Sequence, residues 1–68
     1  MDMDYAIEFE REEDGRWIAE IPSLPGVMAY GASKQEAESK VQAIALRVIA
    51  DKLERDKTTT DHVQFATA

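Results

Sequence analysis

The sequence predicts an α+β fold of element order β-β-β-α-β, in which an antiparallel sheet of three or four strands packs against one helix. Three observations predict it: apolar and polar residues alternate near the N-terminus, a proline- and glycine-containing loop joins two further short strands, and a capped amphipathic segment follows. A chain of 68 residues allows one domain over 1–68 and a small core.

The first three predicted elements are short strands. They are expected at about 4–11, 16–21 and 27–31. In the first, Tyr5, Ile7 and Phe9 alternate with polar or small residues, which is typical of a half-buried strand. Asp14-Gly15 supplies a hairpin turn, and Pro25-Gly26 supplies a tight turn before the third strand. Both alternating sets of residues in the third strand are apolar, so the sequence does not determine which face of this strand is buried.

A helix is predicted over about 34–55, because Ser33 and Glu36 have the spacing of a capping box. One apolar stripe at helical spacing is expected to lie on the sheet: Ala37, Val41, Ile44, Ala45 and Val48. Residues 62–66 alternate as a possible fourth strand, and a frayed tail is the alternative.

A second set of apolar residues falls elsewhere on the helical wheel: Leu46, Ile49 and Leu53. These side chains are either ordinary exposed residues or a contact between subunits. A chain this small without a single cysteine has no disulfide framework to support its core. We therefore expect a homo-oligomer.

The net charge of −6 is concentrated at the N-terminus. Residues 1–14 contain seven acids and one base, whereas the remaining 54 residues contain seven of each. This segment is either a solvated strand protected by charge or a docking face for a basic partner. The predicted partner contacts are Glu8, Glu10, Glu12, Glu13 and Asp14. An acidic field repels phosphates, and no basic patch with stacking aromatics is visible, so direct nucleic-acid binding is not expected.

The sequence contains no recognisable catalytic, cofactor-binding or metal-binding constellation. His62 is the only histidine and has no motif around it. Glu8, Glu10 and Glu20 could converge as in a metal-dependent hydrolase, but they are predicted on the solvent face, where no pocket excludes water. We expect no enzyme activity. No membrane span or signal peptide is visible, so a cytoplasmic location is expected.

One longer pattern resembles a known family. Glu10 to Gly15 is followed by Trp17, then by Ala19-Glu20-Ile21-Pro22 and Leu24-Pro25-Gly26, with Gly31-Ala32-Ser33 and Glu36-Ala37 continuing the match. This succession is similar to the N-terminal signature of the HicB-like antitoxins of toxin–antitoxin systems. The resemblance covers roughly residues 4 to 50 and combines a hairpin, a proline loop and a capped helix at fixed spacing.

The resemblance implies a partial ribonuclease H-like fold without ribonuclease H activity. It also implies binding and neutralisation of a small basic, HicA-like toxin that cleaves messenger RNA, and it is compatible with an oligomer. Many relatives carry a C-terminal DNA-binding module, for which no room is expected before Ala68. The alternative is an oligomeric binding or regulatory module of the same fold without a toxin partner.

Overall fold

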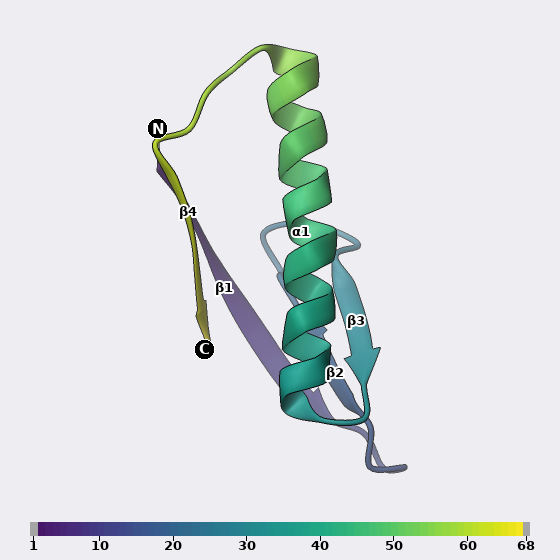
Figure 1. The fold of residues 1–68 in the computed structure, drawn as a ribbon. Helices are drawn as coiled ribbons and strands as arrows, with labels where there is room; N and C mark the ends of the chain where they lie inside the picture. Colours follow the sequence, from purple (N-terminus) through teal and green to yellow (C-terminus); the bar gives the residue numbers. More distant parts are fainter. Residues whose placement is uncertain (1, 68) are drawn as a thin grey trace.

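The computed structural model describes residues 2–67 and has the element order predicted from the sequence (Figure 1). The strands are β1 (Asp2–Arg11), β2 (Trp17–Glu20), β3 (Met28–Gly31) and β4 (His62–Thr67), and the helix is α1 (Lys34–Asp56). They form one four-stranded sheet of order β3-β2-β1-β4, with α1 across one face. The predicted α+β class and the possible fourth strand are both confirmed.

The sheet is mixed, which corrects the prediction of a wholly antiparallel one. β1 and β2 pair antiparallel, as do β2 and β3, but β4 pairs parallel to β1, with Asp2 opposite His62 and Ile7 opposite Thr67. The helix explains the direction, because α1 returns the chain to the end of the sheet where β1 begins (Figure 1). Alternation within residues 62–66 reveals a strand but carries no information about its direction.

Two glycine turns shape the β1-β2-β3 part of the sheet as predicted. Gly15 has φ +90° in the hairpin turn, and its N–H donates to the carbonyl of Glu12 at 3.0 Å. Gly26 has φ +85°, and the next N–H, that of Val27, donates to Leu24 at 3.0 Å. Proline before a positive-φ glycine is the type II turn pattern. Leu24 packs against the core and holds this loop to the sheet.

The core lies between α1 and the inner face of the sheet, and the helix contributes one residue per turn. The buried helical residues are Ala37, Val41, Ala45 and Ile49. This is an i,i+4 row, so the buried face drifts around the helix as α1 crosses the sheet. The predicted stripe was correct for its first members but wrong at its end: Val48 is 40% exposed, and Ile49 is 3% exposed.

The third strand has one buried face and one exposed face. Ala29 is buried, together with Val27 just before the strand, whereas Met28 and Tyr30 point away from the helix and are exposed. This arrangement identifies the buried face of the third strand, which the sequence left undecided. Composition could not resolve the choice because Met28 and Tyr30 are as apolar as the residues that face the helix.

The start of α1 is capped as the sequence predicts. The backbone N–H of Glu36 donates to Ser33 Oγ at 3.1 Å, and Glu36 Oε1 accepts from the backbone N–H of Ala32 at 3.0 Å. The Ala32 bond, supported by Lys40 at 3.4 Å, lowers the pKa of the Glu36 carboxyl. A carboxyl with a lowered pKa in the folded state stabilises the fold above its unfolded-state pKa and stops doing so as the pH falls.

Glu36→Gln is therefore expected to lower stability at neutral pH, because the neutral amide loses the charge-assisted bond and the pairing with Lys40. The difference between the two proteins should shrink as the pH falls through the ordinary glutamate pKa of 4.5 and below. Urea unfolding of both proteins between pH 7 and pH 3 measures it. A difference that is independent of pH would contradict the role assigned to the Glu36 charge.

Candidate partner-binding surface

The face of the sheet opposite α1 is not covered by any other element of the described chain, and we call it the open face. Side chains alternate along a strand, so every second residue of each strand points to this face. They are Asp2, Asp4, Ala6, Glu8 and Glu10 on β1, Ile18 and Glu20 on β2, Met28 and Tyr30 on β3, and His62, Gln64 and Ala66 on β4. The open face is therefore rich in carboxylates and carries a small apolar area.

Three glutamates form the centre of the charged area. Glu8 lies directly opposite Glu20 in the β1–β2 register, and Glu10 lies one pleat further along β1, opposite Ile18. Like charges directly opposite each other destabilise a sheet. Within residues 2–67 no lysine, arginine or histidine forms an ion pair with any of the three glutamates. The open face thus presents carboxylates that lack counter-ions from the described chain.

An apolar area adjoins these carboxylates on β2 and β3. Ile18 lies opposite Tyr30, and Glu20 lies opposite Met28. Met28 is 40% exposed and Tyr30 is 43% exposed. The guanidinium of Arg16 lies 4.7 Å from the centre of the Tyr30 ring, within the range of a cation–π contact. Carboxylates beside exposed aromatic and aliphatic side chains make a surface suited to the long, amphipathic side chains of lysine and arginine.

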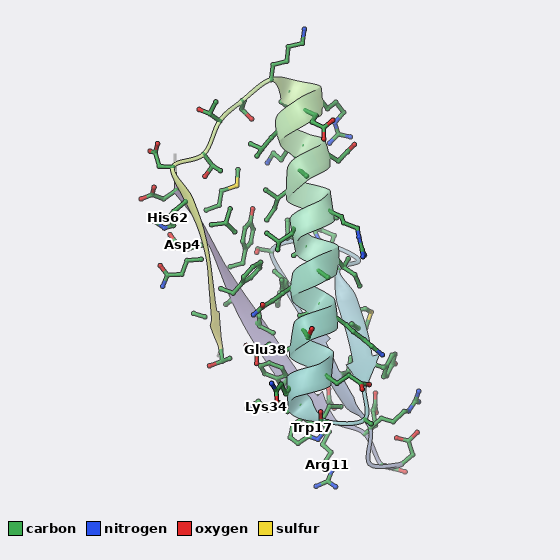
Figure 2. All side chains as sticks on the ribbon, viewed as in Figure 1. Asp4, Arg11, Trp17, Lys34, Glu38 and His62 are labelled. Carbon is green, nitrogen blue, oxygen red and sulfur yellow. The ribbon has the colours of Figure 1, made fainter. Side chains whose placement is uncertain are left out.

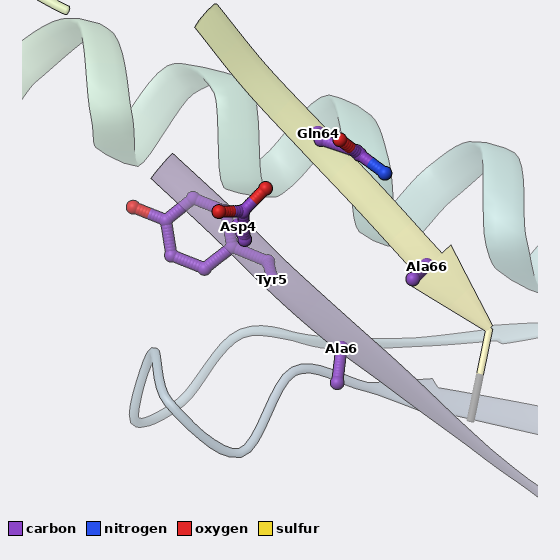
Figure 3. A pocket seen from close by; sticks show the side chains of 5 residues that line it. All are labelled: Asp4, Tyr5, Ala6, Gln64 and Ala66. Carbon is purple, nitrogen blue, oxygen red and sulfur yellow. The ribbon is translucent and has the colours of Figure 1, made fainter. Parts of the chain in front are cut away.

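A shallow hollow lies on the other half of the open face, between β1 and β4. Ala6 and Ala66 are opposite each other in the register, and their small side chains leave a depression of about 230 Å³ (Figure 3). Asp4 and Gln64 line the same hollow. The hollow is shallow and open to solvent.

The five acids predicted as partner contacts are divided by the fold. Glu8 and Glu10 lie on the open face, whereas Glu12, Glu13 and Asp14 lie in the hairpin turn beyond the end of β1. Asp14 is occupied within the chain: its carboxylate accepts from the backbone N–H of Arg16 at 3.0 Å and from the side-chain Nε at 2.7 Å. The backbone bond, supported by the guanidinium, lowers the pKa of the Asp14 carboxyl. Asp14 is thus a turn-stabilising residue.

Glu20 was not among the predicted contacts, yet it lies at the centre of the charged area. Its place on the solvent face beside Glu8 and Glu10 was predicted from the sequence and is confirmed, because strand β2 alternates and a hairpin with the turn at Asp14-Gly15 sets β2 beside β1. The register that places Glu20 opposite Glu8 depends on the length of the turn, which has five residues, 12–16, between the paired residues Arg11 and Trp17. That length could not be assigned from the sequence.

Cations shield the aromatic residues at the hairpin end of the inner face. Lys34 Nζ lies 4.8 Å from the centre of the Phe9 ring, and the guanidinium of Arg11 lies 5.9 Å from that of Trp17 (Figure 2). At the other end of β1, His62 lies between two carboxylates, with Nδ1 3.3 Å from Asp2 and Nε2 3.4 Å from Asp4. His62 thus links the start of β4 to the start of β1.

The three predicted oligomer residues occupy different environments. Leu46 is 47% exposed and Leu53 is half-buried, but Ile49 is part of the buried row and cannot contact a partner from the folded chain. Placing Ile49 in the exposed stripe was therefore wrong. The reason is the drift of the buried face along α1, which brings position 49 toward the sheet.

Taken together, the fold and its surfaces define a small α+β domain with one helix-covered sheet face and one open acidic face. Within residues 2–67, no three histidine, aspartate or glutamate side chains lie close enough to hold a metal ion. The described part of the chain also has no helix that is both long and apolar enough to cross a membrane.

The chain is similar to a curated protein of Thermoplasma acidophilum, UPF0150 protein Ta0767. The two are 29% identical over 66 residues, which cover 96% of each chain. The alignment therefore includes every strand and the helix. No protein-family model matches the chain, and no solved structure matches it at a significant level.

Proposed function

We propose that this chain is a non-enzymatic, antitoxin-like protein that binds and neutralises a small basic ribonuclease through its open face. One observation carries the proposal: Glu8, Glu10 and Glu20 lie together on an uncovered sheet face without ion pairs from the described residues. A partner that supplies lysine or arginine there relieves the repulsion between Glu8 and Glu20 and gains opposite-charge contacts.

The nature of the partner follows from the resemblance to HicB-like antitoxins. Those proteins neutralise small basic toxins that cleave messenger RNA. A surface that binds RNA must be basic, so an acidic protein that competes with RNA for that surface inhibits cleavage. The apolar area around Met28 and Tyr30 adds non-ionic contact area next to the charges. The turn acids, Glu12 and Glu13, lie outside the open face and would act mainly on long-range attraction.

The second candidate is an oligomeric binding or regulatory module without a toxin partner. It is favoured by the exposed Leu46 and by the outer edge of β4, which pairs with no strand of the described residues. The two candidates differ in whether a basic protein is the partner.

Co-purification separates them. The chain is co-expressed with the product of the neighbouring reading frame, provided that this frame encodes a small basic protein. We expect the two proteins to elute together at low salt and to separate as the salt concentration rises, because exposed charge pairs are screened. A neighbouring basic protein that fails to co-elute at low salt would contradict the proposal and favour the second candidate.

A further inference from the structure

Strand β4 is an edge strand with one unused side. On its inner side it pairs with β1 over six consecutive register positions, from Asp2–His62 to Ile7–Thr67. On its outer side it pairs with no strand among residues 2–67. Backbone N–H and C=O groups on that side are therefore available to another strand, and exposed edges of this kind recruit strands readily.

The edge of β4 lacks the usual protection. Proteins guard such edges with lysine, proline, bulges or very short strands. Residues 62–67 contain no lysine, arginine, aspartate, glutamate, proline or glycine, and their continuous register with β1 shows no bulge. The opposite edge, β3, has only four residues. Charged residues make up 32% of the chain, yet none of the protective residues occurs in β4. This absence indicates that the outer edge of β4 is covered and not exposed to solvent.

We propose that β4 pairs antiparallel with β4 of a second copy of this chain, which joins two four-stranded sheets across a two-fold axis. With Phe65 on the axis, Gln64 lies opposite Ala66 of the second copy, and Val63 lies opposite Thr67. Every pair keeps its residues on the same face of the sheet, and no charge opposes another. A basic partner finds no carboxylate on β4 to pair with, so charge complementarity does not favour it at this edge.

The packing of β4 supports the second copy as the occupant. Val63 and Phe65 face the helix side but are only half-buried, and the ring of Phe65 lies 6.0 Å from that of Tyr5. The chain is also elongated, with a radius of gyration of 12.7 Å, compared with about 11 Å expected for a compact domain of this length. A second β4 extends the sheet beside these residues and covers them, which a small core requires.

The exposed helical residues offer a poorer dimer surface. Leu46 and Val48 are both exposed, but two positions along a helix are separated by about 200° around its axis. These two side chains therefore point to different sides of α1, and Leu53, which lies on the same side as Leu46, is half-buried. The β4 edge is the continuous self-complementary feature of the described chain.

Light scattering after size-exclusion chromatography tests the proposal. The wild-type chain at about 100 µM should have twice the monomer mass of 7.6 kDa. Gln64→Lys with Ala66→Lys should halve that mass, because four lysines would face each other across the axis. Gln64→Lys with Ala66→Glu should restore the dimer, because opposite charges then face each other. A control with the same charge change on exposed helical positions, Gln35→Lys with Ser39→Lys, should remain dimeric.

Other outcomes overturn the proposal. They are a monomeric wild-type chain, a Gln64→Lys/Ala66→Lys variant that stays dimeric, or a dimer that Leu46→Glu dissociates while the β4 variants leave it intact. If circular dichroism shows that the lysine variant does not fold, hydrogen exchange of the wild-type chain tests the proposal instead. Protection of the residue 62–67 amides should rise with protein concentration, and protection independent of concentration would contradict pairing at this edge.

Discussion

Replacing Gly31 by alanine is expected to destabilise the fold by about 3 kcal/mol. Gly31 is buried at the end of β3, directly against the first turn of α1. A Cβ there would overlap the backbone nitrogen of Ala37 and would lie 3.0 Å from both Ala37 Cα and the carbonyl carbon of Glu36. These are backbone atoms of a capped helix, so relief requires α1 to move away from the sheet.

A loss of this size is a large fraction of the stability of a small domain and corresponds to a fall in Tm of roughly 10–20 °C. Thermal and urea unfolding followed by far-ultraviolet circular dichroism measure it. Gly15→Ala is the matched control, because Gly15 has positive φ but no atom within 4 Å of the added Cβ. It should cost only about 1 kcal/mol of backbone strain. Equal losses for the two variants would refute close packing as the role of Gly31.

Reversing the central charges of the open face is expected to give the largest effect on partner binding. Glu8→Lys with Glu20→Lys should weaken the complex with the basic partner by about 2 kcal/mol, roughly thirtyfold, because like charges then face the partner. The free protein should keep its stability, since one like-charge pair across the strands replaces another. Isothermal titration calorimetry at low and physiological salt measures the affinity and its salt dependence.

Two variants with the same change in net charge are the controls. Glu12→Lys with Glu13→Lys reverses two charges in the hairpin turn, and Glu54→Lys with Asp56→Lys reverses two charges at the end of α1. Both should weaken binding by less than fivefold, because exposed charges away from the contact act mainly through screened long-range attraction. Equal losses for all three variants would mean that net charge alone governs the interaction and that the open face has no special role.

Local pattern in this chain predicted local structure well. The Asp14-Gly15 and Pro25-Gly26 turns and the Ser33–Glu36 cap all form as expected, because each depends on residues close in sequence. The alternation of Tyr5, Ile7 and Phe9 likewise predicted the inner side of β1. These features are determined by the backbone preferences and hydrogen bonds of a few neighbouring residues.

The features that sequence reasoning missed depend on distant parts of the chain. The parallel direction of β4 follows from the path of α1, and the burial of Ile49 instead of Val48 follows from the angle at which the helix crosses the sheet. The pairing of Glu8 with Glu20 follows from the hairpin register. The sequence placed Glu8, Glu10 and Glu20 on the solvent face, and the pairing of β1 with β2 in the hairpin bears this out, but it did not show that Glu20 lies directly opposite Glu8.

The most direct test of the proposed function is an RNA-cleavage titration. If the neighbouring reading frame encodes a small basic protein, that protein is incubated with messenger RNA and increasing amounts of the wild-type chain or of the Glu8→Lys/Glu20→Lys variant. We predict that cleavage by the basic protein falls to background near a one-to-one ratio with the wild-type chain, and that the variant requires a large excess. Undiminished cleavage at a tenfold excess of the folded wild-type chain would contradict the proposal that this protein neutralises a ribonuclease through its open face.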